Sequence, residues 1–213
     1  MAAGIFCIEN WSKDLRSSGT VGPLLDFMSS SGDARVIHQR VSTVYELTHY
    51  LRRFSALRSY QVAYLALHGD RGKVYVGDEG VELEDLVTWT MLSGRRSGGV
   101  GSNGDSDDSV IDLRGKVLYF GSCGSLGIPR DRLRLMREET GAAAVCGYMR
   151  QVDWYAAASF EILLLATLVN AVDGNRSGDV HRSLPPAISG LRRSAGTFVD
   201  RTLGFVCEPD WRP

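Results

Sequence analysis

Two short apolar runs each end in a side chain that could take part in nucleophilic chemistry. The first, residues 64–70, reads Tyr-Leu-Ala-Leu-His-Gly-Asp and ends around His68 and Gly69. The second, residues 117–125, reads Val-Leu-Tyr-Phe-Gly-Ser-Cys-Gly-Ser and carries Cys123 in a turn of small residues. In open α/β sheets, ligands collect at the carboxyl ends of the strands. The two runs therefore predict that an imidazole and a thiol meet at one edge of a sheet.

A thiol beside an imidazole is an arrangement suited to acyl transfer. The imidazole of His68 would accept the proton of Cys123, and the thiolate would then attack a carbonyl carbon. The oxyanion formed in that step needs hydrogen-bond donors. The backbone N–H groups of Gly69 and Cys123 are the candidates, because small neighbouring residues let a substrate approach the backbone closely.

This pattern resembles that of the caspase-like cysteine peptidases of clan CD. In that clan one strand ends in His-Gly, and a second strand ends at the catalytic cysteine roughly 50 residues later. The motifs that carry the resemblance are Leu-His-Gly-Asp at residues 67–70 and Phe-Gly-Ser-Cys-Gly at residues 120–124. The most similar group is the bacterial CHAT-domain proteases. The resemblance implies a bacterial cysteine endopeptidase in which His68 is the general base, Cys123 the nucleophile, and Gly69 a donor to the oxyanion.

Two features depart from the caspases proper. The residues before Cys123 are Gly-Ser, where caspases have Gln-Ala. A segment rich in Gly, Ser and Asp, residues 93–109, precedes the cysteine, whereas the caspase linker follows it. These differences argue against a caspase and leave the resemblance to the wider clan.

The resemblance also implies a first specificity pocket, shaped by the residues from Tyr148 to Trp154. Many clan members outside the caspases cleave after basic residues and use an acidic group in this pocket. Asp153, flanked by Trp154 and Tyr155, would then bind an arginine or lysine side chain, whose apolar stem would lie against these aromatic rings. The alternative is that Asp153 is the N-cap of a helix that begins near Trp154, because Asp is a preferred capping residue.

Two other functions remain open at this point. The chain could be a non-catalytic interaction module that keeps a caspase-like fold with an inert Cys123, since fold does not determine function. It could also be a cysteine-type amidotransferase or hydrolase, in which Gly121 to Cys123 form a nucleophile elbow. Such enzymes place the histidine after the nucleophile, and His181 is the candidate.

Apolar strand-like runs alternate with segments of helical periodicity along the whole chain. This alternation predicts an α/β fold: a caspase-like three-layer sandwich with a mostly parallel, about six-stranded central sheet and helices on both faces. We expect one domain over residues 1–213 and a flexible loop at residues 93–109. Strands are expected at 4–9, 34–41, 60–67, 73–76, 116–120, 142–148 and 202–207, and helices at 21–28, 42–55, 82–92, 130–140 and 154–172. A polar stretch with Pro185-Pro186 is expected before a further segment at 187–193.

Composition excludes several classes of function. The formal net charge of −1 provides no general attraction to nucleic acid or to an anionic membrane. The four cysteines lack metal-binding spacing, and there is no phosphate loop, so we expect no metal and no cofactor. The start of the chain does not read as a signal peptide, and the apolar run at 162–169 is too short to span a bilayer. We therefore expect a cytoplasmic enzyme with a protein or peptide substrate, and leave open an activating or regulatory protein partner.

Overall fold

A sheet with the strand order β2-β1-β3-β6-β7-β8 lies at the centre of the molecule. The computed structural model describes residues 3–11, 19–32, 34–92, 111–173 and 180–211. Neighbouring strands are parallel, except that β8 runs antiparallel to β7. The six strands are β1 (Gly4–Asn10), β2 (Arg35–Arg40), β3 (Tyr60–Asp70), β6 (Val117–Phe120), β7 (Ala144–Tyr148) and β8 (Phe205–Glu208). The predicted α/β class with a mostly parallel sheet is confirmed.

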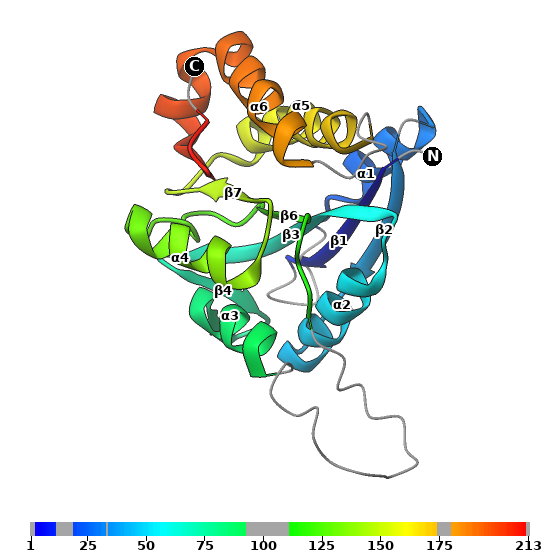
Figure 1. Cartoon of the computed structure of the whole chain (residues 1–213), viewed down its shortest axis with the longest axis vertical. Helices are drawn as coiled ribbons and strands as arrows, with labels where there is room; N and C mark the ends of the chain where they lie inside the picture. Colours follow the sequence, from blue (N-terminus) through cyan, green and yellow to red (C-terminus); the bar gives the residue numbers. More distant parts are fainter. Residues whose placement is uncertain (1–2, 12–18, 33, 93–110, 174–179, 212–213) are drawn as a thin grey trace.

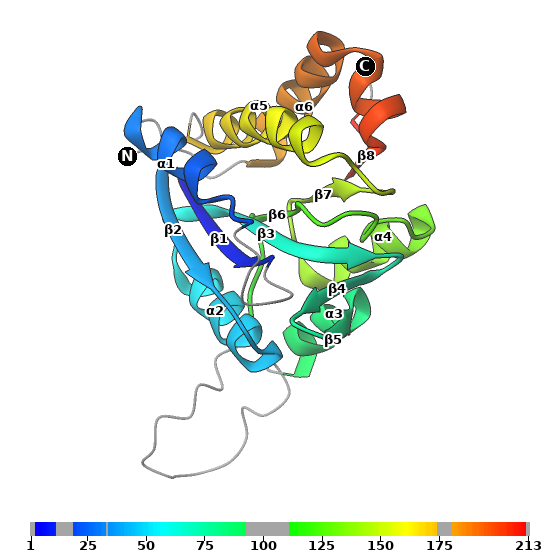
Figure 2. The same ribbon diagram turned by 180° about the vertical axis from the view of Figure 1, so that it is seen from behind.

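Helices cover both faces of this sheet, which gives three layers (Figure 1). One face carries α1, α5 and α6, and the other carries α2, α3 and α4, as the view from behind also shows (Figure 2). The helices are α1 (Gly22–Ser30), α2 (Val44–Ala56), α3 (Leu83–Leu92), α4 (Arg130–Thr140), α5 (Trp154–Asp173) and α6 (Val180–Ala195), followed by a π-helix, η1 (Phe198–Leu203).

Alternation along the strands divides the buried side chains between two cores. Tyr64 and Tyr119 belong to the core under α1, α5 and α6. Leu65 and Phe120, the next residues along the same strands, belong to the core under α2, α3 and α4. Successive side chains of a strand point to opposite faces, so a continuous apolar run is what a sheet covered on both faces requires.

Local sequence signals determine the ends of two of these helices. Thr43 and Glu46 form a capping box at the start of α2: the Thr43 side chain accepts a hydrogen bond from the N–H of Glu46, and the Glu46 carboxylate accepts one from the N–H of Thr43. Gly141, with φ of 71°, ends α4 in the left-handed conformation that glycine adopts without strain.

Lys116 ties the start of β6 to the end of α2. Its ammonium group donates hydrogen bonds to the carbonyl oxygens of Phe54, Leu57 and Tyr60, at 3.2, 2.8 and 2.8 Å. Phe54 and Leu57 lie at the end of α2 and Tyr60 at the start of β3, so the ammonium group bridges the connection between these two elements. This contact fixes where β6 enters the sheet beside β3.

The α6 segment differs from the prediction. Pro185 and Pro186 lie inside a helix that begins at Val180, where we expected a polar, non-helical stretch. A proline in a helix removes one backbone hydrogen bond. The apolar face of α6 offsets this cost, because Val180, Leu184 and Ile188 recur every four residues and are buried in the core with α5.

The end of the chain also differs in detail. Residues 202–203 were expected in the last strand but belong to η1, and Gly204, with φ of 59°, separates η1 from β8. The short strand expected at 73–76 is β4, and it forms a hairpin with β5 (Glu79–Glu82) beyond the end of β1. The loop expected at residues 93–109 lies outside the described residues.

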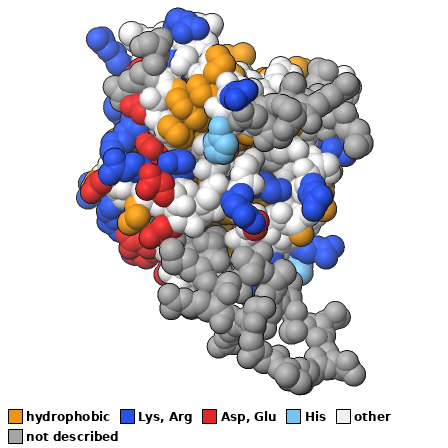
Figure 3. Space-filling model, in the orientation of Figure 1, with side chains coloured by type: hydrophobic (Ala, Val, Ile, Leu, Met, Phe, Trp, Pro, Cys, Tyr) orange, Lys and Arg blue, Asp and Glu red, His pale blue; other side chains and the backbone are white. Residues whose placement is uncertain are grey.

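The surface around α4 carries charges of both signs. Asp131, Arg132, Arg134, Glu138 and Glu139 are exposed on this helix. Figure 3 shows basic and acidic side chains side by side on the left of the molecule, over α4. A surface with interspersed charges does not form the one-sided basic patch typical of nucleic-acid binding.

Helix α5 corrects one expectation about membranes. Among the described helices, α5 is the one that is long and apolar enough to cross a bilayer, over Trp154–Val172. From the sequence we had considered only the apolar run at residues 162–169, which is too short. Half of that window is buried inside the fold, and Phe160, Leu164 and Leu165 pack in the core. These contacts are those of a core helix in a globular domain.

Candidate active site

The register of two neighbouring strands brings His68 and Cys123 to the same edge of the sheet. β3 and β6 are parallel, and Leu65 lies directly opposite Phe120. His68 comes three residues after Leu65, and Cys123 three residues after Phe120. The turn that carries Cys123 is held against β3, because the carbonyl oxygen of Leu65 accepts hydrogen bonds from the N–H of Gly121 at 3.0 Å and from the Ser122 hydroxyl at 3.3 Å.

Gly69 packs directly against that turn. A Cβ atom at this position would lie 2.8 Å from the Cβ of Ser122 and 2.9 Å from both the carbonyl oxygen of Cys123 and the Cβ of Ser125. Such distances are shorter than van der Waals contact, and most of the atoms concerned belong to the backbone or lie next to it. A glycine is therefore required at position 69 for the two segments to meet.

The backbone N–H of Gly69 faces the Cys123 turn. Successive residues of a strand direct their backbone groups to alternate sides, so Gly69 faces the same side as Leu65, four residues earlier. Leu65 faces β6, as its hydrogen bond from Gly121 shows. β4 (Lys73–Val76) pairs with β3 on the opposite side, after a two-residue turn in which Arg71 and Gly72 both have positive φ. The N–H of Gly69 therefore lies on the side of β3 that faces β6 and the Cys123 turn.

A backbone carbonyl orients the imidazole of His68. The Nε2 atom lies 3.1 Å from the carbonyl oxygen of Trp11, the residue that follows β1. A carbonyl oxygen only accepts hydrogen bonds, so Nε2 carries a proton in this contact. The Trp11 indole also meets the His68 ring edge to face, with centroids 5.0 Å apart. The sequence analysis did not identify Trp11, whose role depends on a backbone atom.

Cys123 is distinguished from the other cysteines by its exposure. Cys7, Cys146 and Cys207 are free thiols buried inside the sheet, whereas Cys123 is half-buried. Burial raises the pKa of Cys7 and Cys146 well above the ordinary value of a thiol, which makes them poor nucleophiles. The Sγ atom of Cys123 lies 3.8 Å from the carbonyl oxygen of Val152 and borders a cavity.

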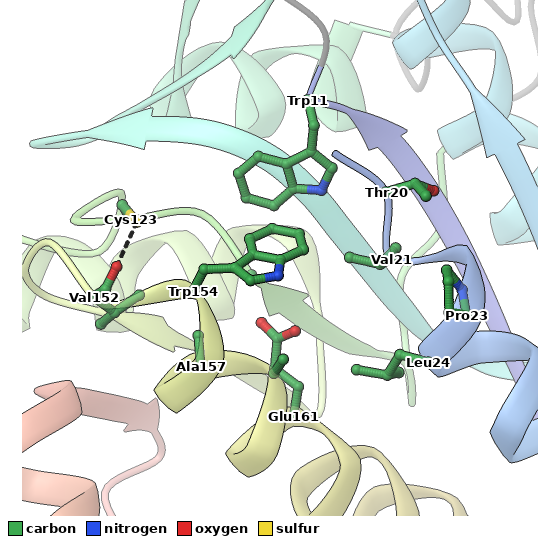
Figure 4. Close-up of a pocket in the computed structure, with 12 residues that line it drawn as sticks. Trp11, Thr20, Val21, Pro23, Leu24, Cys123, Val152, Trp154, Ala157 and Glu161 are labelled. Carbon is green, nitrogen blue, oxygen red and sulfur yellow. Dashed lines mark hydrogen bonds between the residues drawn. The ribbon is translucent and has the colours of Figure 1, made fainter. Parts of the chain in front are cut away.

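This cavity has a volume of about 290 Å³ and opens beside the thiol (Figure 4). Its walls come from four separate parts of the chain: Trp11 after β1, residues 20–24 at the start of α1, the turn at 121–123, and residues 152–161 leading into α5. Trp11 and Trp154 meet edge to face, with centroids 5.2 Å apart. Trp11 therefore contacts both His68 and Trp154.

The three residues expected in the specificity pocket have different positions. Trp154 lines the cavity. Asp153 is exposed and caps α5: its carboxylate accepts a hydrogen bond from the N–H of Ala156 at 3.0 Å, and it does not line the cavity. Tyr148 is fully buried behind the cavity, because β7 directs its side chain into the core under α5. The structure thus favours the capping interpretation of Asp153.

Glu161 is the acidic residue that borders the cavity, and the sequence analysis did not identify it. It is only 4 % exposed. Its Oε2 atom accepts a hydrogen bond from Tyr64 at 2.6 Å, and its Oε1 atom accepts one from Tyr119 at 2.8 Å and a longer one from Tyr148 at 3.5 Å. The signal that could have found it is a single charged residue in an otherwise apolar helical run, which needs a partner when buried.

The pKa values in this cluster reflect its burial. Burial raises the pKa of the Glu161 carboxyl above its ordinary value, and the three tyrosine hydrogen bonds oppose that effect by stabilising the anion. Burial and the nearby carboxylate raise the pKa of Tyr64 and Tyr119 well above the usual value of a phenol. These tyrosines are therefore neutral hydrogen-bond donors over the physiological range.

The alternative base, His181, is not part of this arrangement. It is exposed in the first turn of α6, a helix that packs against α5 and η1. It is not among the residues that line the cavity. The sequence had placed it in a polar loop, and the apolar face of α6 explains the difference.

The described part of the chain contains no cluster of three or more His, Cys, Asp or Glu side chains that could hold a metal ion. What the described residues offer instead is a half-buried thiol, an imidazole bonded to a backbone carbonyl, and a cavity beside the thiol. A scan against protein-family models found no match, and a search among curated proteins found no similar sequence. The case for a function therefore rests on the geometry of this site.

Proposed function

We propose that the protein is a cysteine endopeptidase of the caspase-like type, most similar to the bacterial CHAT-domain group, that cleaves protein or peptide substrates in the cytoplasm. The observation that carries the proposal is the combination of the β3–β6 register with the orientation of His68. The register brings the imidazole and the thiol of Cys123 to one sheet edge, and the carbonyl of Trp11 leaves Nδ1 as the proton acceptor.

The proposed reaction follows from these positions. Nδ1 of His68 takes the proton of Cys123, and the thiolate attacks the carbonyl carbon of the substrate. The N–H groups of Gly69 and Cys123 stabilise the oxyanion. His68 then returns the proton to the leaving amine, and water hydrolyses the acyl-enzyme with the same imidazole as base. The carbonyl of Trp11 accepts a hydrogen bond from the imidazolium throughout.

The experiment that tests this proposal uses a peptide acyloxymethyl ketone library as a covalent probe and a peptide library as substrate. We expect the probe to add once, at Cys123, and hydrolysis to fall by roughly 10²- to 10⁴-fold in His68→Ala and to be lost in Cys123→Ala. His181→Ala is the matched control and should be fully active.

Two outcomes would contradict the proposal. Activity that survives His68→Ala but disappears in His181→Ala would favour the amidotransferase-like arrangement. A folded protein that neither reacts with the probe nor hydrolyses any peptide would favour a non-catalytic interaction module.

A further inference from the structure

Two of the buried cysteines lie opposite each other in the last two strands of the sheet. Cys146 in β7 pairs with Cys207 in β8, and the two strands are antiparallel. Both side chains belong to the core under α1, α5 and α6, so they lie on the same face of the sheet. Directly opposite residues on one face are the closest cross-strand neighbours that a sheet offers. The two thiols therefore face each other inside the protein.

The hydrogen bonds between these strands show which kind of pair the two cysteines form. The N–H of Met149 donates to the carbonyl oxygen of Gly204 at 3.0 Å, so these residues are a hydrogen-bonded pair. Hydrogen-bonded and non-hydrogen-bonded pairs alternate along an antiparallel ladder. Cys146 and Cys207 are three steps along the ladder from that pair, so they are a non-hydrogen-bonded pair. The carbonyl oxygen of Cys207 accepts from the Arg130 guanidinium at 3.2 Å, as expected for a carbonyl that points away from β7.

A pair of this kind meets the geometric requirement for a disulfide bond. In a non-hydrogen-bonded pair the Cα atoms are about 4.5 Å apart, and the side chains approach each other more closely than in the alternative pair. A disulfide needs Cα atoms that are about 4.4–6.8 Å apart. The bond can therefore form while the strands keep the register that they already have.

A buried arginine lies beside the thiols. Arg192 of α6 is only 4 % exposed, and its guanidinium lies over the ring of Phe205, 5.4 Å from the centroid. Phe205 precedes Cys207 by two residues, so both side chains are on the same face of β8. Two of the guanidinium nitrogens, Nε and Nη2, have no hydrogen-bond partner among the described residues.

The charge of this arginine affects the thiols directly. Burial raises the pKa of the Cys146 thiol well above its ordinary value, and the hydrogen bond with the Cys207 thiol adds to the rise, whereas the positive charge of Arg192 opposes it. A nearby cation favours the thiolate, which is the reactive form of cysteine. Arg192 is therefore placed to stabilise a thiolate at this pair when one forms.

The position of β8 gives a small oxidant a route to the pair. Of the described strands, β8 is the outermost on its side of the sheet, next to β7. A four-residue strand at an edge opens locally more readily than a strand with neighbours on both sides. Cys7 is a useful contrast, because it is equally buried in β1 but lies between β2 and β3, opposite His38 and Tyr64. It has no thiol facing it in either neighbouring strand.

We propose that Cys146 and Cys207 are a redox site that a peroxide converts into a reversible disulfide. One thiol attacks an oxygen of hydrogen peroxide and breaks the O–O bond, which gives a sulfenic acid and water. The other thiol attacks the sulfenic sulfur, forms the S–S bond and releases a second water. The peroxide takes up the two electrons that the thiols lose. This site is separate from the proposed catalytic pair and does not depend on the proposed function.

The bond also restrains the turn that carries Cys123. The carbonyl oxygen of Tyr148, the last residue of β7, accepts a hydrogen bond from the N–H of Leu126 at 3.0 Å. The carbonyl oxygen of Arg150 accepts one from the N–H of Gly124 at 2.9 Å. A covalent link between β7 and β8 opposes the local opening of β7, and these hydrogen bonds carry the restraint to the turn.

The first test treats the Cys123→Ala protein with hydrogen peroxide, since the half-buried Cys123 would itself react. The intact mass should fall by two hydrogen atoms, and peptide mapping without reduction should join the peptides that contain Cys146 and Cys207. Dithiothreitol should reverse both changes. Cys7 is the matched control and should remain a free thiol. Free thiols at positions 146 and 207, addition of oxygen at either one, or a disulfide that includes Cys7 would overturn the inference.

Thermal unfolding measures the effect of the bond on the fold. Because the disulfide closes a long loop of the unfolded chain, the oxidised protein should melt about 5–15 °C above the reduced protein. In the same Cys123→Ala background, Cys207→Ala and Cys146→Ala should each melt at one temperature with or without peroxide. A melting temperature that stays the same or falls when the disulfide forms would contradict a bond that fits the existing register.

Hydrogen exchange tests the restraint on the turn. On oxidation, the amides of Gly124 and Leu126 should exchange at least several-fold more slowly, and the amides of α2, on the other face of the sheet, should change less. Equal exchange of the turn amides in both states would refute the link between the disulfide and the Cys123 turn. None of these measurements uses peptidase activity, so an inactive protein would refute the proposed function alone, and a failure to form the disulfide would refute this inference alone.

Discussion

His68 is oriented by a main-chain atom. Its Nε2–H donates to the carbonyl of Trp11, so the tautomer is determined by the path of the backbone after β1. A carboxylate in that position would require its own counter-charge or its own hydrogen bonds. The carbonyl of Trp11 avoids that requirement. The orientation of His68, the proposed base, therefore depends on the position of the backbone at residue 11.

Asp153 illustrates a residue whose role can be tested by stability and specificity together. Because its carboxylate caps α5 and lies outside the cavity, Asp153→Asn should preserve both the free energy of unfolding and the substrate profile. Asp153→Ala should lower the free energy of unfolding by about 1 kcal/mol, the usual value of an N-cap, with no change in profile. Urea denaturation and a peptide library measure the two effects. A changed profile in the Asn variant would return Asp153 to the specificity pocket.

Glu161 should make stability depend on pH in a defined direction. Its pKa in the folded protein is raised above the ordinary value of 4.5 by burial, so the folded state keeps the proton longer than the unfolded state does. The stability it contributes is fully present below about pH 4.5 and is lost as pH rises through the folded pKa. Relative to Glu161→Gln, the unaltered protein should therefore lose stability as pH increases above 4.5, by at most about 1.4 kcal/mol per pH unit.

Urea denaturation from pH 4 to pH 8 measures this effect. Glu79→Gln, at an exposed position in β5, is the control and should show no comparable trend. A difference between the unaltered protein and Glu161→Gln that stays constant with pH, or that grows in favour of the unaltered protein, would contradict the assignment of Glu161 as a buried carboxyl.

At the scale of the elements, the site depends on the contact between the end of β3 and the turn after β6. Gly69→Ala would press a methyl group against Ser122, Cys123 and Ser125. The turn must shift to admit it, and a displacement near 1 Å costs on the order of 10²-fold in rate. We expect kcat/KM to fall by about that factor, and the free energy of unfolding to fall by about 1–3 kcal/mol.

Gly190→Ala is the matched control for this substitution. Gly190 lies inside α6, where an added Cβ would meet nothing closer than the Arg193 guanidinium at 3.9 Å. Alanine is the better helix former, so stability should rise by about 0.5–1 kcal/mol with unchanged activity. If Gly69→Ala behaved like this control, the close contact between β3 and the Cys123 turn would be disproved.

Most of the strands and helices around the site could be predicted from the sequence, and one helix could not. The strands around His68 and Cys123 were predicted because apolar runs that end in small residues are strong local signals. Their register, which brings the two residues to one edge, follows once they are parallel neighbours. The helical residues around Pro185 could not be predicted, because the packing of α6 on α5 outweighs a local signal that ordinarily ends a helix.

At the scale of the whole molecule, the cavity was the least predictable feature. Its lining comes from Trp11, the start of α1, the Cys123 turn and α5. These segments are far apart in the sequence and meet only in the folded sheet with α1 and α5 packed on one face. Which carboxylate faces that space depends on the rotation of α5 about its axis. Glu161 lies on the face toward the sheet and Asp153 at the exposed end, although both belong to the same region of sequence.

The layered fold also explains why one cysteine out of four is suited to react. The sheet is covered on both faces, so thiols within its strands are buried, and only a residue beyond a strand end, at the uncovered edge, reaches solvent. Cys7, Cys146 and Cys207 lie within β1, β7 and β8, and Cys123 follows β6. The greater exposure of Cys123 is therefore a property of the architecture.

The most direct test of the central claim is the rate at which iodoacetamide alkylates Cys123 in the native protein at neutral pH, followed by intact mass and peptide mapping. A thiol whose proton passes to a neighbouring imidazole reacts roughly tenfold faster or more than an isolated thiol. We predict a single addition at Cys123, slowed at least about tenfold in His68→Ala and unchanged in His181→Ala. Equal rates in the unaltered protein and His68→Ala, or first addition at another cysteine, would contradict the His68–Cys123 pair.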